Sequence, residues 1–260
     1  MKTTATMLAA AAVIGLGASS AASAGTINVG GVVWDPDSAL DLQVQSLNMR
    51  ETAVTGVGDE LSGAGQVGGI NGDLGFCPGC HLTFTFDGYT VSRIEDNQVA
   101  FTGGSIDFWV DNTESFDATD PGTWGAGAHW LEVAGVDHIR GTFFEGEEVA
   151  TLFGNFTGTI ADPEDGSDGF GLLDVVGGLA APYIVSGDIH ELFETGLNGF
   201  ADLGFSSEFQ RDNAVEGYPI GGTATLRGES QRVPEPGSMA LLGLGLLFMG
   251  LVLYRRRGDA

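Results

Sequence analysis

The chain has 260 residues, and its 35 acidic residues against ten Lys and Arg give a formal net charge of −25 at pH 7. Such a charge repels phosphate backbones and anionic lipid, so we expect no nucleic-acid partner. Aromatic and branched residues recur in short alternating runs, and the 43 glycines follow no collagen-like period, so the composition excludes a disordered or collagenous chain.

The first 24 residues have the three-part pattern of a secretory signal peptide. Lys2 supplies a positive charge, and residues 7–18 form an apolar run too short for a comfortable membrane span. Ala22 and Ala24 supply the small side chains that signal peptidase requires. We therefore expect this enzyme to cut after Ala24, which leaves Gly25 as the first residue of the mature chain. The alternative is a retained anchor or a buried N-terminal helix.

The only two cysteines stand in the sequence Cys77-Pro78-Gly79-Cys80, and His81 follows directly. Pro-Gly suits the two central positions of a type II turn, which would bring both thiols together for a disulfide in an oxidising compartment. Cys-x-x-Cys-His is also the attachment motif for c-type haem, but the candidates for a second axial ligand show no recognisable arrangement. We predict the disulfide, with covalent haem and metal or redox chemistry as alternatives.

Residues 25–232 are expected to form one secreted β-rich domain. Residues 82–86 and 89–91 alternate apolar and polar side chains around Asp87-Gly88, which predicts a β-hairpin. Further short runs, separated by turn residues, cover 99–101, 105–110, 130–133, 139–144, 149–153, 156–160, 172–176 and 223–226. This spacing without helical patterns indicates an all-β fold, an antiparallel β-sandwich or a jelly-roll-like arrangement.

An acidic segment and a short helix interrupt this pattern. Asp162, Glu164, Asp165 and Asp168 stand on one glycine-containing segment that we expect to be a loop, and carboxylates of this kind could hold a hard cation such as Ca²⁺. A solvated acidic loop is the simpler interpretation, because clustered carboxylates arise by chance in so acidic a chain. Residues 188–195 have a capping Asp and helical apolar spacing, which predicts one short helix ended by Gly196.

The C-terminus combines three signals in order. Val233-Pro234-Glu235-Pro236 is held extended by its prolines, residues 239–254 form an apolar run that can span a thin bilayer, and Arg255, Arg256 and Arg257 follow. The arginines should stay in the cytoplasm, so the run orients as a transmembrane helix with the acidic domain outside.

This tail, residues 233–260, resembles the PEP-CTERM sorting signal of Gram-negative bacteria that secrete exopolysaccharide. The resemblance implies recognition by exosortase, a membrane enzyme that would cut near the Pro-Glu-Pro and release or re-anchor the protein at the cell surface. A permanent tail anchor is the alternative. Signal peptidase and exosortase are then the expected processing partners, and the membrane is contacted through the C-terminal helix before processing.

No catalytic motif is present, neither a nucleophile elbow nor a phosphate loop, and the four histidines have no metal-ligand spacing. We predict a non-enzymatic structural or adhesive protein of the envelope or exopolysaccharide matrix, without a cofactor unless calcium binds. A polysaccharide-acting enzyme is the first alternative, since a pair of carboxylates cannot be recognised from sequence spacing. A c-type haem protein is the second alternative.

The four tryptophans could line a sugar platform or the core, and the core is the more common place for aromatic residues in alternating runs. They are Trp34, Trp109, Trp124 and Trp130.

Overall fold

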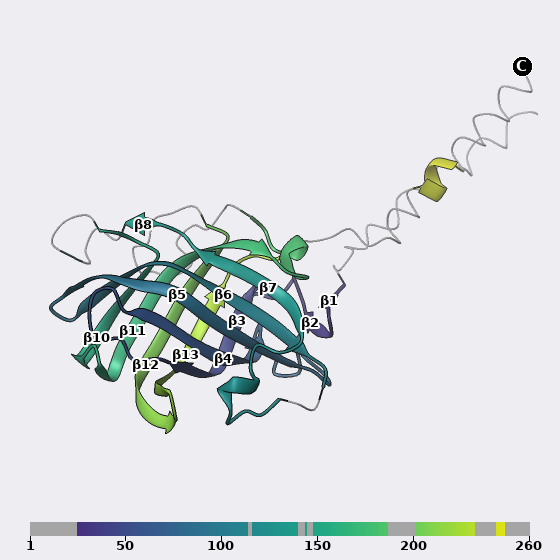
Figure 1. Cartoon of the computed structure of the whole chain (residues 1–260). Helices are drawn as coiled ribbons and strands as arrows, with labels where there is room; N and C mark the ends of the chain where they lie inside the picture. The colour runs from purple at the N-terminus through teal and green to yellow at the C-terminus, as the bar shows by residue number, and fades with distance from the viewer. Residues whose placement is uncertain are drawn as a thin grey trace, which may run out of the picture.

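A computed structural model of the chain describes residues 25–113, 116–139, 144, 148–186, 201–231 and 243–247 (Figure 1). Strands dominate these residues, and two short 3₁₀ helices, η1 and η2, lie in connections. The strands are β1 Ile27–Val29, β2 Val32–Trp34, β3 Gln43–Glu51, β4 Glu60–Ile70, β5 His81–Glu95, β6 Gln98–Asp111, β7 Ala128–Gly135, β8 His138–Ile139, β9 Val149–Ala150, β10 Leu152–Thr159, β11 Asp162–Gly177, β12 Leu203–Val215 and β13 Tyr218–Arg227, with η1 at Pro121–Thr123 and η2 at Ala181–Tyr183.

Nine of these strands form one antiparallel sheet in the order β10-β11-β12-β13-β3-β4-β5-β6-β7. Two additional pairings, β10 with β6 and β11 with β7, join the two edges of this sheet, so it closes on itself. The predicted all-β antiparallel class is confirmed. The long strands β6 and β11 make the closure, because each pairs with three neighbouring strands.

The closed sheet has two distinct ends. The turns β5–β6, β10–β11 and β12–β13 lie together at what we call the hairpin end. Strands β1 and β2 lie at the opposite, terminal end, on the right in Figure 1. Antiparallel pairing of strands joined by short turns produces this arrangement, since each strand must return to the end from which its neighbour started.

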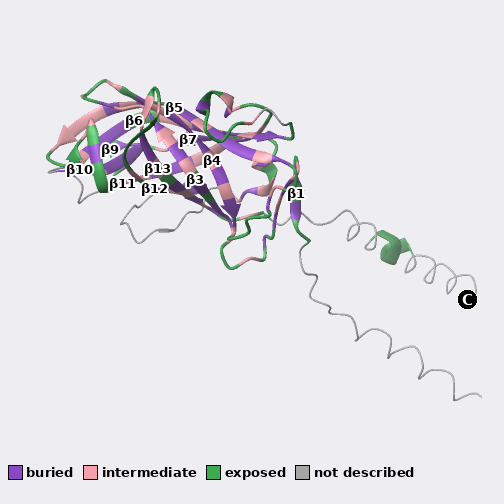
Figure 2. Cartoon of the chain, turned by 90° about the horizontal axis from the view of Figure 1, so that it is seen from below, coloured by how far each residue is buried: buried purple, intermediate pink, exposed green. Residues whose placement is uncertain are grey.

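The core fills the inside of the closed sheet. Alternate residues of each strand point inward, as in β5, where Leu82, Phe84 and Phe86 are buried. Trp130 is fully buried at the terminal end, where its ring makes an edge contact with Trp34 at 5.8 Å between centroids. Figure 2 shows the same alternation of buried and less buried residues along the strands.

The predicted hairpin at Asp87-Gly88 is wrong. Strand β5 continues through this dipeptide, and β6 pairs with it on both sides, Asp87 with Ser105 and Tyr89 with Gly103. Gly88 and Gly104 both have positive φ, 72° and 87°, and lie against each other as a local irregularity in the ladder. A turn-forming dipeptide therefore lies inside a long strand here, because two facing glycines permit positive φ while the strands keep their register.

The acidic segment is also not a loop. Residues 162–169 form the first half of β11 and pair with β10, with the left-handed Gly166 (φ 89°) at an interruption of the ladder.

Three other predictions concern residues outside the described part of the chain. They are the helix at 188–195, the signal peptide and most of the sorting tail, of which only a helical stretch at 243–247 is described. In the part of the chain that is described, no helix has the length and apolar character needed to cross a bilayer.

Candidate functional site

The two ends of the folded domain are tied together by three side chains that we call the terminal clasp: Trp34, Asp41 and Ser230. The indole Nε1 of Trp34 donates a hydrogen bond to Ser230 Oγ at 2.8 Å. Ser230 Oγ donates to Asp41 Oδ1 at 2.6 Å, and the Ser230 amide donates to Asp41 Oδ2 at 2.9 Å. Burial raises the pKa of Asp41 above its ordinary value, although these hydrogen bonds act in the opposite direction. The folded domain thus extends to within four residues of Pro234.

Cys77 and Cys80 are joined by a disulfide in the structure. Gly79 has φ 84°, the left-handed conformation that the third position of a type II turn requires, and the Cys80 amide donates to the Cys77 carbonyl at 3.2 Å. The Val33 amide donates to the Phe76 carbonyl at 2.7 Å, so this turn is fastened to β2. The disulfide therefore lies at the terminal end, where β5 begins.

The four carboxylates predicted for calcium lie along one strand. Asp162 forms an ion pair with Arg211 at 3.5 Å, while Asp168 accepts a hydrogen bond from Asn155 Nδ2 at 2.7 Å. Asp165 and Asp168 line an open surface groove, and Glu164 is exposed. These four residues do not form a group of converging ligand atoms. The calcium site stays a prediction.

A different set of ligand atoms converges on the outer face of β6 and β7. Asp107, His129 and Glu132, which we call the triad face, each offer one ligand atom, and these atoms lie within 4.8 Å of one another. Within the described residues this is the sole group of three or more such side chains. His129 Nε2 and Asp107 Oδ1 are 2.8 Å apart, and all three side chains are half-buried.

A β-bulge in β7 creates the triad face. Trp109 pairs with His129 and Phe108 with Leu131, so Trp130 is the extra residue opposite β6. His129 and Glu132 are three residues apart and would point to opposite faces of a regular strand. The bulge puts both on the outside, while Trp130 and Leu131 are fully buried. Sequence spacing missed this site for that reason. The available signal was only that His129 and Glu132 flank an apolar pair.

The triad face has aromatic and hydroxyl neighbours. Trp109 packs against His129 with 4.8 Å between ring centroids, and its indole Nε1 donates to Thr85 Oγ1 at 3.2 Å. Trp109 is the one tryptophan among the four that is not buried. Cross-strand pairing therefore places a partly exposed indole, an imidazole and two carboxylates side by side on the outside of the sheet.

These observations define a closed, acidic all-β domain that ends directly before a C-terminal tail. The family model of the PEP-CTERM protein-sorting motif matches residues 232–257, so this tail is a PEP-CTERM sorting motif. The motif implies export, processing by exosortase and targeting to the cell envelope or surface. No match was found for the chain among curated proteins or among solved structures.

Proposed function

We propose that the protein is a non-enzymatic, adhesive component of the cell envelope or exopolysaccharide matrix, displayed after signal peptidase and exosortase have processed it. The triad face is the surface through which it binds polysaccharide, by holding a divalent cation. The observation that carries this proposal is the convergence of Asp107, His129 and Glu132 beside the partly exposed Trp109.

The chemistry of the triad face supports a cation. Imidazole nitrogen and carboxylate oxygen are ligands of divalent transition metals such as Zn²⁺, and three protein ligands leave coordination positions for an external group. The Glu132 carboxylate makes no hydrogen bond with the described residues, so it is available to a cation without breaking an existing hydrogen bond.

Charge makes a bridging cation useful here. A chain with a formal charge of −25 repels an anionic polysaccharide, and repulsion of this kind is felt well before contact. A divalent ion held by two carboxylates can accept a sugar carboxylate or hydroxyl in its open positions. The indole of Trp109 adds an apolar surface on which a sugar ring can pack.

The test measures binding of the processed protein, purified from its host, to immobilised exopolysaccharide of the same host. We expect added Zn²⁺ to strengthen binding and a chelator to abolish this gain. Glu132→Gln should weaken the metal-dependent binding at least about tenfold. Loss of a residue that only supports a metal ligand already lowers metal affinity by about this factor, and loss of the ligand itself should cost no less. Glu208→Gln, which removes the same charge from β12, should bind as the natural protein does. If neither the chelator nor Glu132→Gln changes the affinity for the exopolysaccharide, the proposal is overturned.

The same samples separate the alternatives. A polysaccharide-acting enzyme would release new reducing ends from the exopolysaccharide during the incubation, whereas an adhesive protein would release none. A c-type haem protein would show a Soret band in the purified, oxidised sample. We expect neither signal.

A further inference from the structure

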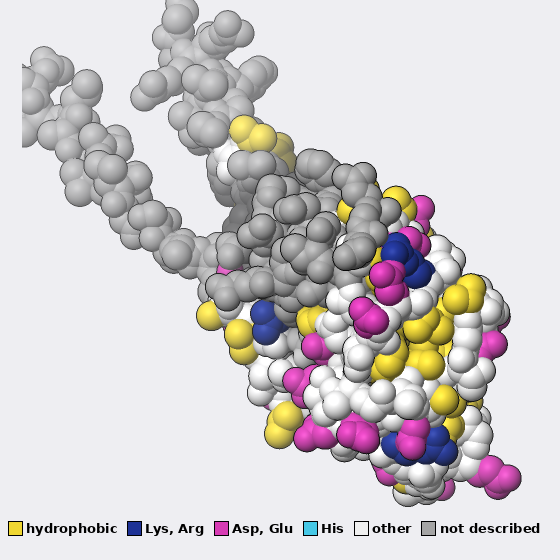
Figure 3. All heavy atoms as spheres, turned by 90° about the vertical axis from the view of Figure 1, so that its left-hand side faces the viewer, with side chains coloured by type: hydrophobic (Ala, Val, Ile, Leu, Met, Phe, Trp, Pro, Cys, Tyr) yellow, Lys and Arg dark blue, Asp and Glu magenta, His cyan; other side chains and the backbone are white. Residues whose placement is uncertain are grey.

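A cavity of about 60 Å³ lies inside the closed sheet near the hairpin end. Its walls are almost entirely apolar and include aromatic rings from β5, β6, β10 and β12, among them Phe86, Phe101, Phe156 and Phe209. Figure 3 faces the hairpin end and shows hydrophobic side chains at the surface between groups of basic and acidic side chains. The space exceeds the roughly 10–15 Å³ that one water needs and is smaller than a benzene-binding cavity of about 150 Å³.

One carboxyl group lines this cavity. Glu51, the last residue of β3, is 7% exposed and has no hydrogen-bond or ionic partner among the described residues. Burying a carboxyl group in apolar surroundings without a partner is costly, so native proteins seldom retain one without a use. Burial alone raises the pKa of Glu51 to about 7, and no neighbouring charge contributes.

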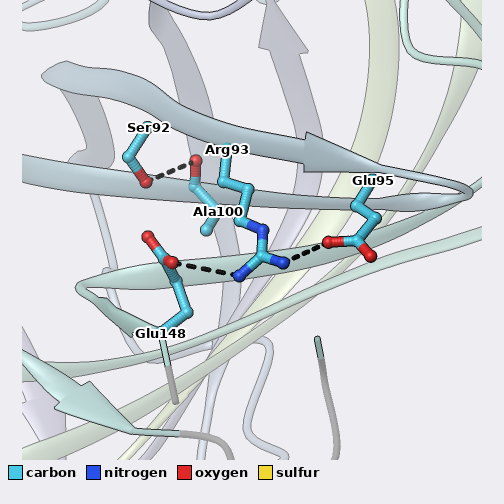
Figure 4. A network of polar contacts seen from close by, with 5 residues as sticks. All are labelled: Ser92, Arg93, Glu95, Ala100 and Glu148. Atoms are coloured by element: carbon cyan, nitrogen blue, oxygen red, sulfur yellow. Dashed lines mark hydrogen bonds and ion pairs between the residues drawn. The ribbon is translucent and has the colours of Figure 1, made fainter. Parts of the chain in front are cut away.

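The nearby cations are already paired elsewhere. Arg50 forms an ion pair with Asp212 at 2.6 Å in the surface groove. Figure 4 shows Arg93 between Glu95 and Glu148, and its guanidinium also lies over the ring of Phe144 at 4.4 Å. The described arginines of the hairpin end therefore leave the Glu51 carboxyl group without a positive partner, which a bound cationic ligand can supply when the group is ionised.

We infer that the cavity binds a short primary alkylammonium ion, with its hydrocarbon among the aromatic side chains and its ammonium group on Glu51. Apolar walls bind the alkyl chain, and an ammonium group offers three donors to a carboxylate that has none. The hydroxyl groups of Thr52 and Ser207, which also line the cavity, can accept further hydrogen bonds. A strongly acidic domain attracts cations and repels carboxylate ligands, which favours an amine over a fatty acid.

The test titrates the processed protein with ethylamine, ethanol and acetate, following binding by NMR chemical shifts of the cavity side chains at pH 6 and pH 8. We expect ethylamine to bind best and to bind more tightly at pH 8, where Glu51 is largely ionised. Among the described residues, Tyr89 is the only other titratable side chain that lines the cavity, and it stays neutral throughout because burial raises its pKa. Ethanol should show no such pH dependence, and acetate should not bind.

Two variants make the result decisive. Glu51→Gln should weaken ethylamine binding roughly tenfold or more, as expected when a charge-assisted hydrogen bond is lost. Glu216→Gln removes the same charge from the exposed β12–β13 turn and should change nothing. Equal binding of ethylamine to both variants, or equal binding of ethanol and ethylamine at pH 8, would refute the inference. Since the cavity and the triad face share no residue, either result leaves the proposed adhesive function unaffected.

Discussion

Glu51 couples the stability of the domain to pH through a single residue. Its pKa is raised from 4.5 to about 7 by burial, so the native state keeps a proton that the unfolded chain releases near pH 4.5. The stabilisation from this group is complete below pH 4.5 and is lost as pH rises through 7. The loss amounts to about 3 kcal/mol at pH 8, because each pKa unit corresponds to about 1.4 kcal/mol.

We therefore expect Glu51→Gln to remove this loss. Urea unfolding at pH 5 and pH 8 should show the free energy of unfolding of the natural protein falling by about 2.5 kcal/mol more than that of the variant, since part of the loss has already occurred at pH 5. Glu216→Gln serves as the control for a change in net charge alone. If all three proteins show the same pH dependence, Glu51 is not buried as described.

At the scale of single elements, the irregularity where Gly88 of β5 faces Gly104 of β6 depends on glycine. An alanine at position 104 would combine a φ of 87° with overlap of its Cβ and the ring of Tyr89. Gly217, in the β12–β13 turn, has a similar φ of 84° but open space around the position of a Cβ. The two positions thus share the backbone conformation and differ in packing.

We expect Gly217→Ala to lower the free energy of unfolding by about 1–2 kcal/mol through backbone strain. Gly104→Ala should lower it by at least about 2 kcal/mol more, because its Cβ also overlaps the ring of Tyr89. Chemical denaturation of both variants measures the difference. Equal losses in the two variants would show that Tyr89 moves away without cost and that Gly104 is not tightly packed against it.

At the scale of the whole molecule, the terminal clasp holds the segment before the sorting motif against the domain. Ser230→Ala removes the acceptor of the Trp34 indole and a donor to Asp41, both partly buried. Loss of a hydrogen-bond partner by a partly buried polar group costs about 1–3 kcal/mol. The population in which the segment before the sorting motif is detached should therefore rise roughly tenfold, while the closed sheet stays folded.

Limited proteolysis with a protease of broad specificity, followed by mass spectrometry, checks this expectation, with faster cleavage within residues 228–231, which follow β13, expected in Ser230→Ala. Ser206→Ala in β12 is the matched control, because the Ser206 side chain has no hydrogen-bond partner among the described residues. Unchanged cleavage in Ser230→Ala would mean that the clasp does not retain this segment.

Alternation of apolar residues was enough to predict the strand character of β5, β6, β7 and β13, though not their length. Strand β4 escaped prediction because its sequence is rich in glycine. The structure explains those glycines: a Cβ at Gly63 or Gly65 would overlap the rings of Phe86 or Phe84 on β5. Whether a glycine marks a turn or makes room for an aromatic ring depends on the neighbouring strand, which sequence spacing does not reveal.

The sequence by itself determined the features that depend on contiguous residues: the sorting tail, the Cys-Pro-Gly-Cys turn, the acidic character and the all-β class. Only the tertiary structure decided the closure of the sheet, the burial of Glu51 and the meeting of Asp107, His129 and Glu132. Each of these depends on pairing between strands distant in sequence and on bulges that shift side chains by one position. A shift of one residue in register exchanges the inner and outer faces of a strand, so local sequence patterns do not locate such sites.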